Sequence, residues 1–550
     1  MSYFIGIFGQ KADCLNLSNV IDLKRYQDNN KSVTLSNLKK FHYQVIGAFE
    51  GVSHTSSTSA NPQDEKYVLI DGHIYTSPHN NSSFIKSFDN DEALQSTLLN
   101  LTGQYAIAYL SHNRLLLCRD HLGIKSLYYS CLPNGCILFS SEIKELLFVL
   151  RDSLTLNQNV IECFRGIGYN LFHEETVFQN IRSVKPGGYI EFRVDGKSLS
   201  YSYYSSQQTS CEIDKELDIP LVEKKLNEGL IQCVDNDVQI PKALFFSGGL
   251  DSSYLFAFLA QKAKSRIVPF TMWDSSNHSD IEDARVLASE FHIDLSEHKV
   301  DWNELNQMII NYAWHFANPL GTNGFDLLGG VAFHILAWII AQKGFQVALC
   351  GEGADEMFIG YHQYHMEPSM LVSALENAIK TYGLRGFKDR LKELGVFSQP
   401  EESLRKIAFE YGLSEYHLRS VECSGNAFNL DIRPPYLNYK LADILLTYPS
   451  CKFIDKKDYW TKIPLRKIFK QTIIQTSART AIRRKRAMSY ALYCFNERLN
   501  EEISKRGLKL SLAEAFWRLF FYLHIDNSFS SAPSFSFTDI LPELERMGER

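Results

Sequence analysis

One short stretch decides the fold of this chain: Ser247-Gly248-Gly249-Leu250-Asp251-Ser252-Ser253. Four apolar residues, 243–246, precede it and predict a buried strand. A helix-like run rich in apolar residues, 254–262, follows it. The stretch is therefore predicted to join a strand to the start of a helix. Its two adjacent glycines let the backbone curl closely around an anion.

The polar residues of this turn point to a phosphate group as the anion. The free N–H groups and the positive end of the following helix would face it, and Ser247, Ser252 and Ser253 add hydroxyl donors. Asp251 would repel a bare phosphate, so it fits only if a divalent cation lies between carboxylate and phosphate. No lysine follows the glycines, which excludes the GxxxxGK[ST] loop. A turn that merely caps a helix is the alternative, and the full seven-residue pattern disfavours it.

Composition and charge are those of a soluble globular protein with two to four domains: 550 residues, 45% hydrophobic and 22% charged. The net charge of −6 disfavours a dedicated nucleic-acid binder. Eleven cysteines, an odd number without a CxxC pair, suit reduced thiols. The longest apolar run, 329–341, is too short to span a bilayer, and the N-terminus lacks a signal-peptide pattern. We therefore expect a cytoplasmic protein with no membrane and no nucleic-acid partner.

The pattern of predicted secondary structure changes near residue 210. Before it, short strand-like runs separated by turn residues predict mostly antiparallel sheets. After it, strands and helices alternate, which predicts a parallel sheet covered on both faces. Ligands of such sheets bind at the carboxyl ends of the strands, and this places Ser247 and Met272 on one rim. We expect domains over 1–210 and 211–526, and a loose Ser-rich tail over 527–550.

A second motif has the same design as the first. The apolar run 347–350 ends in Gly351-Glu352-Gly353-Ala354-Asp355-Glu356. Glycines again open a turn at a strand end, and this turn carries three carboxylates. Such a cluster repels itself unless a cation or a basic group lies among the acids. A solvated acidic loop is the alternative, and the presence of the first motif disfavours it.

The two motifs together resemble those of the synthetase domain of asparagine synthetase, and SGGLDSS alone resembles the pyrophosphate loop of ATP pyrophosphatases. The order and the spacing agree with the pattern "SGGLDSS…GEGADELFGGY". Further matches are DIRPPYLN at 431–438, with Asn438 in place of the family's acid, and LRKIF at 465–469. The basic run 483–486 resembles the segment that supplies a lysine to the reaction centre, here Lys485. A solvated surface or an RNA contact is the alternative for that run.

The resemblance implies a ligase that uses ATP and Mg²⁺. A substrate carboxylate would attack the α-phosphorus of ATP, giving an acyl-adenylate and pyrophosphate. Asp251 and Asp355 would bind Mg²⁺, and Lys485 would neutralise developing charge. Glu352 would either deprotonate the incoming amine or organise the intermediate. The residues that would hold ATP are Phe246, Ser247, Gly248, Gly249, Asp251, Ser252, Ser253, Met272 and Gly351.

The first 210 residues resemble the N-terminal glutaminase domain of the same family. The matching phrases are LTGQYA at 101–106, RDHLGIKSLYY at 119–129, SEIK at 141–144 and KPGG at 185–188. This resemblance implies an αββα domain like that of the N-terminal-nucleophile (Ntn) hydrolases. The expected fold class is therefore α+β for this domain, followed by an α/β ATP-pyrophosphatase domain with a parallel sheet and extra helices.

The chemistry of the glutaminase is missing from this domain. The family uses a cysteine directly after Met1, whereas this chain has Ser2, whose hydroxyl ionises far less readily than a thiol. The family's glutamine-binding turn "NGEIYN" reads DGHIYT at 71–76. Several changes together predict that glutamine hydrolysis is lost, and weak hydrolysis by Ser2 is the alternative.

The source of the amine then stays open between two readings. In the leading one the amine belongs to the substrate, as in β-lactam synthetase, carbapenam synthetase and lasso-peptide cyclases, relatives that keep the domain without its cysteine. The substrate is then a carboxylate-bearing small molecule or a precursor peptide in natural-product biosynthesis, with a partner maturation protein in the peptide case. In the other, ammonia or a separate amine is used; Glu352 favours this, because β-lactam-forming relatives place a tyrosine there. A catalytically dead scaffold is a further alternative.

Overall fold

A computed structural model describes most of the chain, and contacts divide it into two units. The first comprises Met1–Gln158 with Phe172–Ser205, and the second Asn159–Leu171 with Ser206–Arg550. The expected domain boundary near residue 210 lies close to the last passage of the chain from the first unit to the second, after Ser205. The short segment Asn159–Leu171 also belongs to the second unit. The residues described are 3–8, 43–48, 53–55, 66–75, 84, 86–111, 113–193, 198–204, 215–274, 279–319, 324–472, 492–527 and 532–547.

The first unit contains two antiparallel sheets. One has the strand order β2-β1-β8-β7-β9 and the other β11-β10-β6-β5-β4-β3. The strands of the first sheet are β1 (Tyr3–Phe8), β2 (Tyr43–Ala48), β7 (Tyr128–Cys131), β8 (Ile137–Ser140) and β9 (Arg182–Ser183). Those of the second are β3 (Ser53–Thr55), β4 (Lys66–Ile74), β5 (Gly103–Ser111), β6 (Arg114–Arg119), β10 (Gly188–Arg193) and β11 (Ser198–Ser202).

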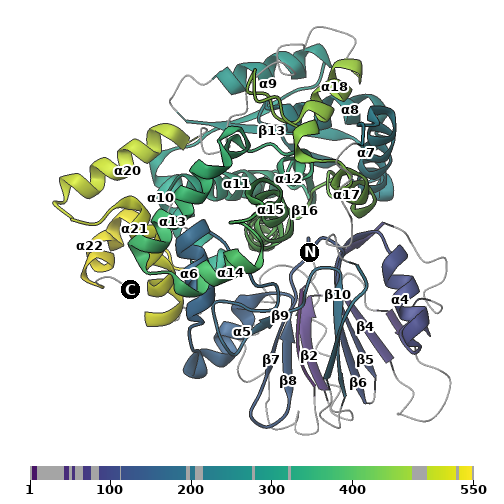
Figure 1. Cartoon of the computed structure of the whole chain (residues 1–550), viewed down its shortest axis with the longest axis vertical. Helices are drawn as coiled ribbons and strands as arrows, with labels where there is room; N and C mark the ends of the chain where they lie inside the picture. Colours follow the sequence, from purple (N-terminus) through teal and green to yellow (C-terminus); the bar gives the residue numbers. More distant parts are fainter. Residues whose placement is uncertain are drawn as a thin grey trace. The chain divides into compact units, whose positions relative to one another are not determined.

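Strand β5 shows how the layers of this unit form. Alternate side chains leave opposite faces of a strand, and both faces of β5 are buried. Ala106 and Ala108 pack between the sheets, where Phe4 and Phe139 of the first sheet meet them. Ile107 faces the other way, onto helix α4 (Asp91–Asn100). Helix α5 (Ile143–Leu150) packs against β7 and β8, and Figure 1 shows both helices. The predicted αββα arrangement is confirmed.

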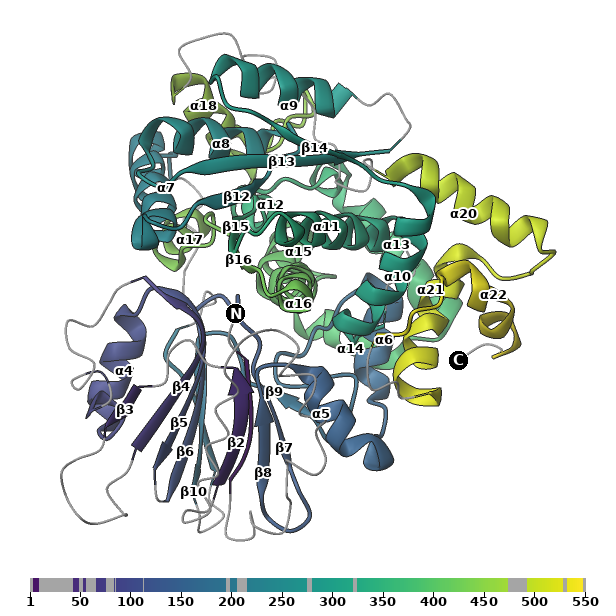
Figure 2. The ribbon, with the colours of Figure 1, turned by 180° about the vertical axis from the view of Figure 1, so that it is seen from behind.

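The second unit is built on a five-stranded parallel sheet, as predicted. Its order is β14-β13-β12-β15-β16, which can be followed across Figure 2. Along the chain, β13 and β14 extend the sheet to one side of β12, whereas β15 and β16 extend it to the other. The direction therefore reverses between β12 and β15, the place where ligands bind in such sheets. The strands are β12 (Lys242–Phe245), β13 (Ile267–Trp273), β14 (Ser296–Lys299), β15 (Val347–Leu349) and β16 (Asp431–Arg433).

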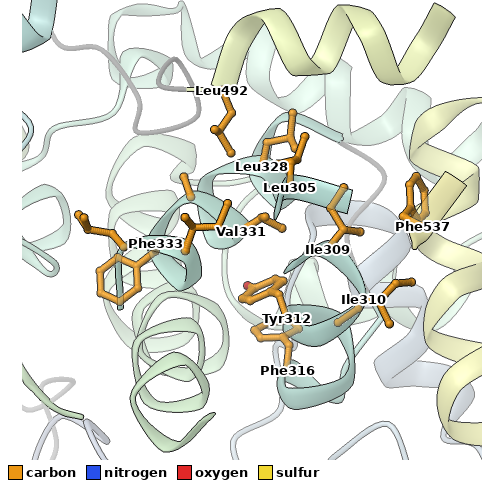
Figure 3. Packing of buried hydrophobic residues seen from close by; sticks show 14 of the residues in the cluster. Leu305, Ile309, Ile310, Tyr312, Phe316, Leu328, Val331, Phe333, Leu492 and Phe537 are labelled. Carbon is orange, nitrogen blue, oxygen red and sulfur yellow. The ribbon is translucent and has the colours of Figure 1, made fainter. Parts of the chain in front are cut away.

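Helices α10 (Trp302–Phe316) and α11 (Gly324–Gln342) carry the main apolar core of this unit. Figure 3 shows Ile309 and Tyr312 of α10 beside Val331 of α11, all fully buried. The long apolar run 329–341 is therefore apolar because α11 is a core helix. In the part of the chain that is described, no helix combines the length and the apolarity needed to cross a membrane.

The C-terminal segment differs from the expected loose tail. Residues Phe537–Arg546 form helix α22, which a capping box of Ser536 and Asp539 begins. Phe537, Leu541 and Leu544 are fully buried in the same core, at the spacing of one helix face. The low apolar content of the preceding Ser-rich stretch hid this short amphipathic pattern from the sequence analysis.

Candidate active site

The predicted anion loop connects β12 to helix α8 (Leu250–Lys262). Gly248 has φ +76°, a conformation that glycine adopts without a steric cost. The Ser252 hydroxyl accepts a hydrogen bond from the backbone N–H of Ser247 at 3.2 Å, and the Ser247 hydroxyl accepts one from Gly249 at 3.3 Å. These bonds hold the loop wrapped around its own serines at the N-terminus of α8, where backbone N–H groups suit an anion.

The acidic turn lies directly beside this loop, because β12 and β15 are neighbours and pair in register. It leads from β15 into helix α12 (Ala354–Phe358). A Cβ atom added to Gly351 would lie 3.3 Å from the Cβ atom of Asp251, so the backbones of the two turns approach closely. The structure thus brings Asp251 of the anion loop together with Gly351 and Asp355 of the acidic turn. At least 100 residues of the chain separate Asp251 from the other two.

A lysine that the sequence analysis missed joins the two aspartates. Lys462 Nζ lies 2.5 Å from Asp251 Oδ2 and 2.7 Å from Asp355 Oδ1, and its side chain is 2% exposed. Burial opposes the charged form of Lys462, but the charges of Asp251 and Asp355 raise its pKa above the usual value. Lys462 is therefore the basic group that the acidic turn requires. The one sequence signal was its place three residues before the LRKIF match.

Gly360 makes room for this ion cluster. A Cβ atom at this position would lie 1.7 Å from Asp355 Oδ1 and 2.2 Å from Lys462 Cε, too close for any side chain. The glycine after the acidic turn is thus required by tertiary packing, since only a residue without a side chain lets the lysine reach both carboxylates.

The cluster also fits the expected Mg²⁺. Proteins bind Mg²⁺ through one or two carboxylates together with phosphate oxygens and water. Asp251 and Asp355 are two such carboxylates, they already share one cationic group, and they lie beside the anion loop. These two residues would hold the ion.

A second cluster surrounds Glu352. His417, the last residue of the π-helical segment Ala408–His417, places its Nδ1 atom 2.8 Å from Glu352 Oε1. Its Nε2 atom lies 2.9 Å from the Tyr361 hydroxyl and 3.5 Å from Glu356 Oε1. Burial would lower the pKa of His417, but the negative charges of Glu356 and Glu352 and the bond to Glu352 raise it to about 9. No local motif marks His417, so sequence reasoning missed it.

Glu356 and Tyr361 form the buried end of this cluster. The Glu356 side chain is 1% exposed, and burial raises the pKa of its carboxyl group despite the nearby charge of His417. The Tyr361 hydroxyl donates a hydrogen bond to Glu356. Burial and the charge of Glu356 raise the pKa of Tyr361 well above its usual value, so this hydroxyl keeps its proton.

Other predicted site residues have different surroundings. The Phe246 side chain is buried and stacks on Phe256, with ring centroids 4.7 Å apart. Met272 belongs to the apolar core, and Ser253 is fully buried behind the anion loop. The structure gives these three side chains packing contacts rather than an open surface. Ser2 and Lys485 lie outside the described residues.

In the first unit, Asp71, the first residue of the altered DGHIYT motif, lies in strand β4 and belongs to a buried ion pair. Lys125 Nζ lies 3.0 Å from Asp71 Oδ1, and Asp71 is fully buried. Burial raises the pKa of Asp71, although the charge of Lys125 works against this shift. Asp120 holds the neighbouring loop, because its carboxylate accepts the backbone N–H groups of Ile124 and Lys125 at 2.9 Å each. The Asp71 carboxylate is thus paired with a lysine of its own domain.

Replacing Lys462 with methionine is expected to lower the free energy of unfolding by about 3 kcal/mol. Removal of one partner from a buried ion pair costs about 3–5 kcal/mol. The lower end applies because Asp251 and Asp355 keep 23% and 22% of their side chains exposed. Urea unfolding of the full chain measures this loss, and added MgCl₂ should restore part of it by supplying the missing cation.

Lys392 offers a matched control, since it is exposed and paired with Asp389. Lys392→Met should change stability by no more than about 0.5 kcal/mol. A Lys462→Met protein as stable as the parent chain would show that the lysine does not balance the two carboxylates.

Comparison with known proteins gives two family matches. Residues 222–516, more than half of the chain, match the asparagine synthase model, and residues 85–204 match the glutamine amidotransferase domain. Asparagine synthetase [glutamine-hydrolyzing] 1 of Bacillus subtilis is 26% identical over 49% of this chain and 41% of that protein. Amidase chyE of Penicillium rubens is 28% identical over 50% of this chain and 42% of the amidase. The chain thus spans about two fifths of the length of these relatives.

A likeness among solved structures is weaker. The glutamine phosphoribosylpyrophosphate amidotransferase of B. subtilis is 12% identical, with a TM-score of 0.24, over 54% of this chain and 65% of that chain. At this level the likeness supports no functional argument.

Proposed function

Because this chain belongs to the asparagine synthase family, we propose that it is an ATP-dependent, AMP-forming ligase that makes an amide bond. The observation that carries the proposal is the meeting of Asp251, Asp355 and Lys462 beside the anion loop, at the point where the sheet reverses its order. An anion loop next to paired carboxylates suits a polyphosphate substrate that arrives with a divalent cation.

Each group of site residues has its own role in the first half-reaction, the formation of the acyl-adenylate. The loop of Ser247, Gly248, Gly249 and Ser252 binds the departing pyrophosphate through backbone N–H and hydroxyl groups. Mg²⁺, held by Asp251 and Asp355, would supply positive charge to the phosphates. The substrate carboxylate attacks the α-phosphorus, the bond between the α-phosphorus and the bridging oxygen breaks, and an acyl-adenylate forms.

The second half-reaction joins an amine to the acyl group. Glu352 follows β15 in the same turn as Asp355, and we assign it the role of taking a proton from the amine. Lys485 would neutralise the charge that develops on the leaving phosphate. AMP leaves with the electrons of the broken C–O bond.

We propose that the amine does not come from glutamine. Ser2, the altered DGHIYT motif at 71–76 and the Asp71–Lys125 pair support this. The purified protein is expected to release no glutamate from glutamine, and Ser2→Cys is expected not to restore the activity, because Asp71 still replaces the family's asparagine. A coupled glutamate assay measures both. Turnover on the order of 1 s⁻¹ or more by the parent chain would contradict the proposal.

The leading specific reaction is closure of a lactam or macrolactam within one substrate, of the lasso-peptide type. The degenerate glutaminase-like domain supports it, since lactam-forming relatives share that trait. The presence of Glu352 favours the second candidate, which is amidation of a small or sugar carboxylate with ammonia or a separate amine.

One panel tests the ligase proposal and separates its two forms. It contains L-aspartate and other carboxylates with ammonium chloride, and peptides that carry both an α-amine and a side-chain carboxylate. Pyrophosphate release with a peptide that loses the mass of one water supports closure. Release that needs ammonium supports amidation. No release with any member of the panel would contradict the ligase proposal.

A further inference from the structure

The pair of Glu352 and His417 has a proton arrangement that the hydrogen bonds fix. The Tyr361 hydroxyl donates its single proton to Glu356, so it can only accept a bond from His417 Nε2. With Glu356 ionised, Nε2 therefore carries a proton. The other ring nitrogen, Nδ1, faces Glu352 Oε1 at 2.8 Å. Tyr361 thus determines which nitrogen of His417 is turned to the carboxylate.

Two placements of a proton satisfy the bond between Glu352 and His417. Either an imidazolium donates from Nδ1 to an ionised carboxylate, or a neutral ring accepts a proton from a protonated one. The two differ only by movement of one proton between Oε1 and Nδ1, and the remaining bonds of the cluster stay as they are. In both placements the same two atoms stay bonded, so the orientation of the Glu352 side chain is kept.

We propose that His417 is a positioning residue for the amide-forming step, an inference that rests on the function proposed above. His417 Nδ1 holds one oxygen of Glu352, and the second oxygen takes the proton of the amine. As the new C–N bond forms, an N–H bond of the amine breaks, its proton passes to Glu352, and the C–O bond to AMP breaks with its electrons on the phosphate. Adenylation requires none of these contacts.

Replacement of His417 by asparagine or by glutamine tests its two ring nitrogens one at a time. Asparagine places its amide near the position of Nδ1, whereas glutamine places its amide near the position of Nε2. His417→Asn therefore keeps a donor for Glu352, and His417→Gln keeps a partner for Tyr361 only. A purely structural role would make the two variants behave alike or would favour glutamine, which preserves the buried contacts.

The nucleophile provides the second comparison. Hydroxylamine is uncharged at neutral pH and attacks an acyl-adenylate without help from a base, whereas an ammonium group must first lose a proton. The probe is the panel member with the fastest pyrophosphate release. It is combined either with hydroxylamine or with the amine that supports its release in the panel. Hydroxamate then reports formation of the acyl-adenylate, and amide product reports the step that needs Glu352.

His417→Ala and His417→Gln are expected to lower amide formation about 10–100-fold, the usual loss when a residue that orients a reactive group is removed. His417→Asn should stay within a few-fold of the parent chain. Hydroxamate formation and pyrophosphate exchange into ATP should change little in all three variants. His298→Ala, which removes a histidine paired with Glu304 outside this cluster, is the control that should keep most of the amide activity.

Three outcomes would overturn the inference while leaving the ligase proposal intact. These are unchanged amide formation in His417→Ala, a His417→Asn variant no better than His417→Gln, and equal loss of hydroxamate and amide. Absence of pyrophosphate release from the parent chain with the whole panel would overturn the ligase proposal, and this inference with it. Thermal unfolding of each variant confirms that the folded protein is compared throughout.

Discussion

Replacing Asp355 or Asp251 with asparagine is expected to lower carboxylate-dependent pyrophosphate release by about 10²–10³-fold, the cost of removing one group that stabilises developing charge. The amide is nearly the same size as the carboxylate but carries no negative charge. Each variant would therefore leave Lys462 with one anionic partner and Mg²⁺ with one carboxylate. Pyrophosphate release, measured with the active panel member at saturating ATP, reports the effect.

A change of charge elsewhere on the protein serves as the comparison. Asp389 is 70% exposed and pairs with Lys392 on the surface, so Asp389→Asn should leave pyrophosphate release unchanged. A higher MgCl₂ concentration should partly recover the Asp251 and Asp355 variants if weaker metal binding is the cause. Near-full release by either variant at low MgCl₂ would show that its carboxylate does not bind the metal.

Glu352→Gln is expected to lower amide product by about 10²–10⁴-fold, the usual contribution of a general base, while pyrophosphate exchange into ATP continues. Glutamine can still accept a hydrogen bond from His417, but it cannot take a proton from the amine. The two half-reactions should therefore separate in this variant, with the acyl-adenylate formed and then passed slowly to the amine.

The competing explanation is that Glu352 only binds metal or holds the acidic turn. In that case the Glu352→Gln protein should lose exchange and product together. Both signals are measured in the same reaction, with labelled pyrophosphate for exchange and mass spectrometry for the product. Joint loss would rule out a role confined to the second step.

The sequence alone determined the elements that position the site. The apolar runs 243–246 and 347–350 form strands β12 and β15, and the predicted parallel sheet is present. These features follow from local causes: runs of apolar residues make buried strands, and glycines at strand ends make turns. The alternation of strand and helix then predicted that Ser247 and Met272 would share one edge of the sheet.

Tertiary structure alone decided which groups balance the charges of that edge. Lys462 reaches Asp251 and Asp355 from more than one hundred residues away, and His417 reaches Glu352 from the π-helical segment Ala408–His417. No period or turn pattern encodes such partners, because a buried charge needs only an opposite charge within reach, wherever that residue stands in the chain. The sequence predicted that the acidic turn needs a basic group, and packing supplies Lys462 to Asp355 and His417 to Glu352 and Glu356.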